Sequence, residues 1–328
     1  MRTPTKNWLL QRGRRSLNSP PRSRPRTDRM SLGVSTLTQF SIEEPAPGYW
    51  KVVFSNPPIN LLNSTTVLEL GDLVSRIEEA ADLRVVVFVS VHPEFYMARY
   101  DLSDTNPIAF APTETGVTYF IDAMRRINDA ETITIASIRG RARGGGCEFA
   151  LSCDIRFASL ENSTLGQPEV GVGIIPAGGA IERLSGLVGG ARALEIITSA
   201  DDYDARTAEL YGWINRAVPD VELDYFVDQF ARRLARFDRQ ALAAVKRLIR
   251  GRSPAASIDA YRETLAEAYR ETLAELRGFV NSPTTHARRA AVVRHATAVG
   301  GDFELRMGHH LGLIESRGLS EQEVDVNR

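Results

Sequence analysis

Runs of apolar, β-branched residues alternate with helical patterns between Tyr49 and about Pro219. The five runs of strand length are YWKVVFS (49–55), LRVVVFVSV (83–91), ITIASI (133–138), DIRFAS (154–159) and WINRAV (213–218). Strands that alternate with helices are typical of stacked β/α units. The pattern therefore predicts an α/β fold for this part of the chain.

One amphipathic helix is predicted between the first two strands. Apolar side chains recur there at the spacing of a single helix face, and Asn63 or Ser64 stands in the position of an N-cap. The apolar side chains of this face are Val67, Leu70, Val74 and Ile77.

The chain changes character at Asp220, where the strand signals stop. Helices are expected at about 221–236, 239–250, 256–280 and 285–297. Within the third, YRETLAEA (261–268) is repeated as YRETLAEL (269–276). We interpret this repeat as part of a solvated amphipathic helix, with a subunit contact as the alternative.

The composition, 43% apolar and 25% charged, is that of an ordinary soluble globular protein. No apolar run approaches the roughly 20 residues that a membrane-spanning helix needs, so no membrane span is expected.

Cys147 and Cys153 face different sides of one predicted helix. We expect two small buried thiols in a reducing compartment rather than a disulfide.

The charge is unevenly distributed. Residues 1–29 contain nine Lys or Arg and one acid, Asp28, and we predict a disordered basic extension there. We favour an upstream extension with Met30 as the true start, and we expect a cytoplasmic protein. A transit peptide to an organelle matrix and a nucleic-acid-binding arm are the alternatives. No aromatic stacking pattern or recognition-helix motif accompanies the arm, so a nucleic-acid partner is not expected. Residues 315–328 are polar and are predicted to form a mobile tail.

Several common catalytic motifs are missing from the sequence. There is no G-x-S-x-G, no P-loop, and no His or Cys cluster with metal-ligand spacing, so no metal site is expected. The glycines at 144 and 146 do not extend to a G-x-G-x-x-G motif, because Phe149 occupies the third position.

Three consecutive glycines, Gly144 to Gly146, stand between the predicted strand ITIASIRG and a predicted helix that starts at GCEF. We interpret them as the turn between the two elements. A bare helix start offers backbone N–H groups to an oxygen that becomes negative during a reaction, as an oxyanion hole does. A tight packing turn without a ligand is the alternative.

Two carboxylates accompany the glycines. Glu148 lies in the first turn of the predicted helix, and Glu169 follows Pro168 in a second glycine-rich segment, GQPEVGVGIIPAGG. If the two loops converge, one carboxylate can activate water while the other exchanges a proton with carbon, which suits addition of water to a double bond.

The chain resembles the crotonase, or enoyl-CoA hydratase/isomerase, superfamily from about Tyr49 to Val280. The most specific stretches are ITIASIRGRARGGGCEFALSCDIRFAS and LGQPEVGVGIIPAGGAIERLSGLVGG. NPPINLLN (56–63) and FYMARYDLSD (95–104) resemble the family's segment after its first strand and its first oxyanion loop. The resemblance implies a crotonase-like core of stacked ββα units in a spiral over 40–220 and a helical, oligomerising part over 221–314.

The resemblance also implies roles for individual residues. The N–H groups of Ala98 and Gly145 are expected to form the oxyanion hole for a thioester carbonyl. Glu148 is expected to activate water, and Glu169 to protonate the carbon next to the thioester. The substrate-binding residues are expected to be Met97, Arg99, Tyr100, Asp101, Gly144, Gly146, Pro168 and Gly173. The implied activity is enoyl-CoA hydration without a cofactor, in a homo-oligomer, a trimer or a hexamer, whose substrate is an acyl-CoA.

One departure from the family pattern concerns Arg99, which occupies a place where the family usually has glycine. Its side chain is expected to pair with an acid or face solvent, or else to meet a coenzyme A phosphate or a negative group on the acyl chain. A second departure is the connection through LENST (160–164), which is about one residue longer. The other functions left open are a double-bond isomerase, another acyl-CoA enzyme of the superfamily, and a non-catalytic acyl-CoA-binding or RNA-binding protein.

Overall fold

The computed structural model describes residues 36–113, 116–251 and 270–314. Three predicted features therefore lie wholly or partly outside the described residues. They are the basic extension 1–29, the tail 315–328, and the helix expected at 256–280, of which only 270–280 is described. Among the described helices, none combines the length and the apolar composition that crossing a bilayer requires.

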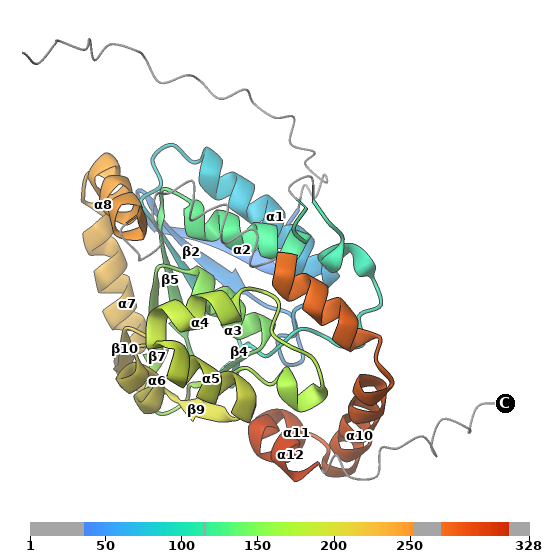
Figure 1. The fold of residues 1–328 in the computed structure, drawn as a ribbon. Helices are drawn as coiled ribbons and strands as arrows, with labels where there is room; N and C mark the ends of the chain where they lie inside the picture. Colours follow the sequence, from blue (N-terminus) through green and yellow to red (C-terminus); the bar gives the residue numbers. More distant parts are fainter. Residues whose placement is uncertain (1–35, 114–115, 252–269, 315–328) are drawn as a thin grey trace, which may run out of the picture. The chain divides into compact units, whose positions relative to one another are not determined.

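A six-stranded sheet contains all five predicted strands (Figure 1). Its strands, in spatial order, are β1 (Phe40–Ala46), β2 (Tyr49–Phe54), β3 (Val85–Ser90), β5 (Ile133–Ile138), β7 (Ile155–Ser159) and β10 (Arg216–Val218). Only β1 and β2 pair in antiparallel fashion, and every other neighbouring pair is parallel. The prediction missed β1, whose FSIEEPA contains three charged or proline residues.

The main sheet is buried on both faces, which explains why β3 reads VVVFVS without alternation. One face packs against α1 (Ser64–Glu79), α2 (Tyr119–Asp129) and α3 (Gly145–Ser152), and the other against α7 (Asp220–Ala235), as Figure 1 shows. Helix α1 begins after Asn63, which caps it by accepting the N–H of Thr66. Of the two predicted N-caps, Asn63 is therefore the correct one.

A second, four-stranded sheet was not predicted. It consists of β4 (Phe95–Met97), β6 (Arg141–Arg143), β8 (Thr164–Gly166) and β9 (Asp202–Asp204), in that order. Strands β4, β6 and β8 are parallel, so their carboxyl ends meet at one edge. Three successive units therefore each give one strand to each sheet and then a helix, which is the stacked ββα arrangement that the sequence resemblance implied.

Strand β6 corrects the interpretation of the triple glycine. The strand lies between the predicted strand 133–138 and helix α3, and only Gly144 has a positive φ, 48°. Gly145 and Gly146 already belong to the first helical turn. Gly146 must lack a side chain for a steric reason, because a Cβ there would overlap the carbonyl oxygen of Met97.

The remaining helices complete the described part of the chain. They are η1 (Pro107–Phe110), η2 (Val170–Val172), α4 (Ala180–Val188), α5 (Gly190–Ser199), α6 (Ala205–Tyr211), α8 (Arg239–Gly251), a helical segment over 270–280, α10 (Pro283–Val299), α11 (Asp302–Leu305) and α12 (Met307–Leu313). The helices expected at 221–236, 239–250 and 285–297 are confirmed. The short helices α11 and α12 were not predicted.

Candidate active site

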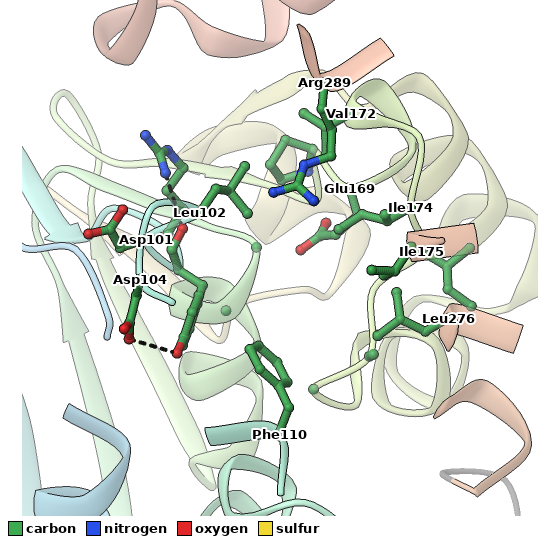
Figure 2. A pocket seen from close by; sticks show the side chains of 18 of the residues that line it. Asp101, Leu102, Asp104, Phe110, Glu169, Val172, Ile174, Ile175, Leu276 and Arg289 are labelled. Carbon is green, nitrogen blue, oxygen red and sulfur yellow. Dashed lines mark hydrogen bonds between the residues drawn. The ribbon is translucent and has the colours of Figure 1, made fainter. Parts of the chain in front are cut away.

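A cavity of about 860 Å³ opens where the parallel strands of the second sheet end (Figure 2). Its walls come from the loops that follow β4 and β8, from the start of α3, and from the C-terminal helices. Segments distant in sequence therefore meet around one space because their strands end at the same sheet edge.

Most of the predicted site residues line this cavity. Those that do are Arg99, Tyr100, Asp101, Gly144, Gly145, Glu148, Pro168 and Glu169. Those that do not are Met97, Ala98, Gly146 and Gly173. The expected convergence of the loops that carry Glu148 and Glu169 is thus observed.

Glu148 is almost fully buried, with 3% of its surface exposed. Its Oε1 accepts hydrogen bonds from the N–H groups of Gly178, at 2.6 Å, and Ala180, at 3.3 Å. Two backbone donors stabilise the ionised form of a carboxylate and fix its orientation. Gly178 can lie this close only without a side chain, because a Cβ there would overlap Glu148 Oε2.

Glu169 has a different environment. It precedes η2, and its carboxylate points into the cavity (Figure 2). A Cβ on Gly144 would lie 2.7 Å from Glu169 Oε1, so the bare glycine makes room for this carboxylate. Glu169 Oε2 is buried and has no hydrogen-bond partner among the described residues.

The two carboxyl groups have raised pKa values for a shared reason. Burial raises the pKa of Glu148 to about 7, against the opposing effect of its two backbone donors. Burial, followed by the charge of Glu148, raises the pKa of Glu169 well above its ordinary value of 4.5. Because Glu148 accepts two N–H groups and Glu169 Oε2 accepts none, the pair favours an ionised Glu148 beside a protonated Glu169.

These pKa values predict a pH-dependent gain of stability in Glu169→Gln. A carboxyl group whose pKa is raised on folding gives its full stabilisation below its unfolded pKa of about 4.5 and loses it as pH rises through the folded pKa. Glutamine removes this loss. Thermal denaturation is therefore expected to give the variant a melting temperature that exceeds the wild-type value more at pH 8 than at pH 5. A difference that is independent of pH would contradict the assignment.

The predicted oxyanion donor Ala98 is placed differently from the expectation. Its N–H donates to the carbonyl oxygen of Asn60 at 3.0 Å, and the residue is 1% exposed. That N–H is already used within the protein and does not face the cavity. The geometry therefore does not support Ala98 as an oxyanion donor.

Tyr100 offers a better placed N–H. Tyr100 pairs with Leu62 in an isolated parallel bridge. The N–H of Leu62 donates to the carbonyl oxygen of Arg99, and the N–H of Asp101 donates to the carbonyl oxygen of Leu62. In such a bridge the N–H of the central residue points away from the partner strand. Tyr100 also lies beside the helix start, since its Cβ would be 3.7 Å from a Cβ placed on Gly145. Helix α3 has no side-chain cap at that start.

Arg99 forms a salt bridge instead of remaining available to a ligand. Its guanidinium contacts both carboxylate oxygens of Glu304 in α11, at 2.5 and 3.4 Å. Of the two expectations for Arg99, pairing with an acid is confirmed, and the proposed contact with a coenzyme A phosphate or an acyl anion has no support. The pair attaches the loop after β4 to the C-terminal helices.

The rest of the lining is mostly apolar, and sequence reasoning did not identify it. The apolar side chains include Phe110, Phe120, Ile174, Ile175, Leu273, Leu276, Val292, Phe303 and Met307. Helical periodicity could have indicated the apolar face of 270–280, but not one on α10, whose apolar residues are spread around the helix. It could not have indicated that the two helices cover the cavity.

Burial raises the pKa of the Cys147 thiol strongly, and both cysteines are free. A thiol that stays protonated is a poor nucleophile. Among the described residues, no group of three or more His, Cys, Asp or Glu side chains has an arrangement that could hold a metal ion.

Comparison with known proteins gives consistent results. A family model described as enoyl-CoA hydratase/isomerase matches residues 47–278. A short-chain-enoyl-CoA hydratase of Clostridium acetobutylicum is 37% identical over 177 residues, and a crotonyl-CoA hydratase of Syntrophomonas wolfei is 32% identical over 185. These matches cover 52% and 56% of this chain, and they span 66% and 71% of the length of those relatives.

A solved structure shows the same relation in three dimensions. The crystal structure of a candidate enoyl-CoA hydratase from Streptomyces avermitilis is similar with a TM-score of 0.76 and 35% identity. The match covers 86% of this chain and 99% of the other. The similarity therefore extends over nearly the whole of that fold.

Proposed function

The chain belongs to the enoyl-CoA hydratase/isomerase family, and we propose that it adds water to the double bond of a 2-enoyl-CoA thioester. The observation that carries this proposal is that two carboxyl groups with raised pKa values, Glu148 and Glu169, line the same cavity. Glu148 lies in the first turn of α3 after Gly144, and Glu169 Oε1 would lie 2.7 Å from a Cβ placed on Gly144. The names of the similar proteins support the same reaction.

In the proposed reaction, the thioester carbonyl accepts hydrogen bonds from the N–H groups of Tyr100 and Gly145. The ionised Glu148 takes a proton from water, and the hydroxyl oxygen forms a bond to the β-carbon of the thioester. The electron pair of the double bond moves toward the carbonyl, whose negative charge the two N–H groups stabilise. The protonated Glu169 then gives its proton to the α-carbon.

The ionisation states inferred from the site match these roles. A base must be ionised and an acid protonated at the same pH, and two coupled carboxyl groups with different environments meet this requirement. Coenzyme A is then the substrate's carrier, and we propose no further cofactor. Assembly as a trimer or hexamer and location in the cytoplasm remain predictions from the sequence.

The oxyanion hole can be tested by replacing Gly145 with proline. Proline is tolerated at the first position of a helix but removes the N–H. The expected result is a loss of about 10² to 10³ in kcat, the typical effect of one lost oxyanion donor. Gly145→Ala is the matched control, since it keeps the N–H and adds one carbon. If both variants lose the same activity, the effect is steric and the donor role is wrong.

A further inference from the structure

Two helices turn one face each toward the cavity. In 270–280 this face contains Leu273, Leu276, Arg277 and Val280, and in α10 it contains Arg289, Val292, Val293 and Ala296. Both sets follow the spacing i, i+3, i+4, i+7 of a single helix face. Each face is apolar apart from one arginine.

Arg289 is half-buried and extends from α10 into the cavity (Figure 2). Among the described residues, its guanidinium has neither a hydrogen bond nor a salt bridge. Its neighbour Arg288 behaves differently, because it bonds to the carbonyl oxygens of Gly171, Leu311 and Ile314. Arg288 thus holds α10 to the fold, whereas Arg289 has no such role.

Four of the five described acidic side chains that line the cavity have hydrogen-bond or ionic partners other than Arg289. Glu304 pairs with Arg99, and Asp101 Oδ1 accepts the N–H and the hydroxyl of Ser103. Asp104 accepts hydrogen bonds from the residues Ser64, Tyr100 and Asn106. Glu148 accepts two backbone N–H groups, and the raised pKa of Glu169 favours its protonated form. None of these carboxylates forms a salt bridge with Arg289, so its guanidinium has no ionic partner among the described residues of its cavity.

We propose that Arg289 binds an anionic group of the thioester substrate. Guanidinium offers parallel N–H donors that match a carboxylate or a phosphate. The anion is either a carboxylate at the far end of the acyl chain or a phosphate of coenzyme A, and the two share this chemistry. Arg277 is more exposed, at the rim of the same cavity, and is the second positive group that such an anion meets. The inference rests on the proposed function, because it concerns the substrate of that site.

The test measures binding by calorimetry, so that it does not depend on turnover. Four saturated thioesters are used, each ending in a carboxylate or in a methyl group and each carried by coenzyme A or by pantetheine, which has no phosphate. The variants are Arg289→Met and Arg289→Lys. Arg294→Met is the control, since Arg294 is exposed on the same helix and does not line the cavity.

A carboxylate ligand predicts that Arg289→Met weakens binding of the carboxylate-ended thioesters by about 10- to 100-fold on both carriers, the usual range for a charged hydrogen bond. A phosphate ligand predicts the same loss for both acyl groups on coenzyme A and none on pantetheine. Arg289→Lys keeps the charge and the fold but loses the paired donors, and an intermediate loss is expected.

Equal changes for all four thioesters, or changes no larger than those in Arg294→Met, would overturn the proposal. So would a wild-type protein that binds none of them. The proposed function is judged separately, from hydration of the matching unsaturated thioesters by the wild type. Selective binding without hydration would retain the anion site and refute the hydratase.

Discussion

Replacing Glu169 by glutamine is expected to lower kcat for hydration by about 10² to 10⁴, the usual contribution of a positioned acid or base. The amide keeps the shape of the side chain but cannot transfer the proton that the α-carbon needs. Since Glu169 does not hold the thioester carbonyl, the affinity for a saturated acyl-CoA should change little. Steady-state hydration of a short 2-enoyl-CoA and calorimetric binding measure the two effects.

The control for this variant is Glu209→Gln, which makes the same chemical change at an exposed position of α6. Its kcat is expected to equal that of the wild type. A Glu169→Gln protein that retains more than a tenth of the wild-type kcat would show that another group supplies the proton.

Replacing Gly146 by alanine is expected to destabilise the whole fold. The new Cβ would overlap the backbone carbonyl of Met97 in β4, and backbone cannot rotate away as a flexible side chain can. Overpacking of this kind costs about 1–3 kcal/mol or more, and we expect a value at or above the upper end. Chemical denaturation of the purified variant measures the free energy of unfolding.

The matched control is Gly71→Ala in α1, where an added Cβ meets no atom within 4 Å. Alanine is favoured over glycine inside a helix by about 1 kcal/mol, so this variant should be more stable than the wild type. If Gly146→Ala were equally stable, helix α3 would not lie as close to β4 as described.

The sequence predicted the main sheet well and the second sheet not at all. Parallel strands buried on both faces need uninterrupted β-branched runs, and LRVVVFVSV and ITIASI are such runs. The strands of the second sheet have only three residues each. Three residues cannot display a period, so these strands exist through pairing with neighbours that the sequence does not place.

The sequence singled out both glutamates as candidates because local chemistry marks them. Glu148 follows a run of glycines, and Glu169 follows a proline within a glycine-rich loop, so each has an unusual backbone next to a charge. The sequence assigned the first oxyanion donor to Ala98, whereas the geometry favours Tyr100, in a loop that carries arginine where the family pattern has glycine. The bridge to Leu62, which decides which N–H groups face the cavity, is a tertiary contact.

Arg289 was missed for a different reason. The sequence places it in a helix with two other arginines, Arg288 and Arg294, the first of which is its direct neighbour. Only the docking of α10 against η2 and α12 distinguishes them, because it turns Arg288 toward backbone carbonyls and Arg289 toward the cavity.

If Glu148 and Glu169 together add water to an enoyl thioester, the product takes its new oxygen from the solvent. Mass spectrometry of the product formed from a short 2-enoyl-CoA in water enriched with oxygen-18 measures this. We expect a 3-hydroxyacyl-CoA that carries one oxygen-18 with the wild type, and its loss in both Glu148→Gln and Glu169→Gln. Unlabelled thioester with a shifted double bond, or free acid labelled in its carboxylate, would show that the two glutamates do not catalyse hydration.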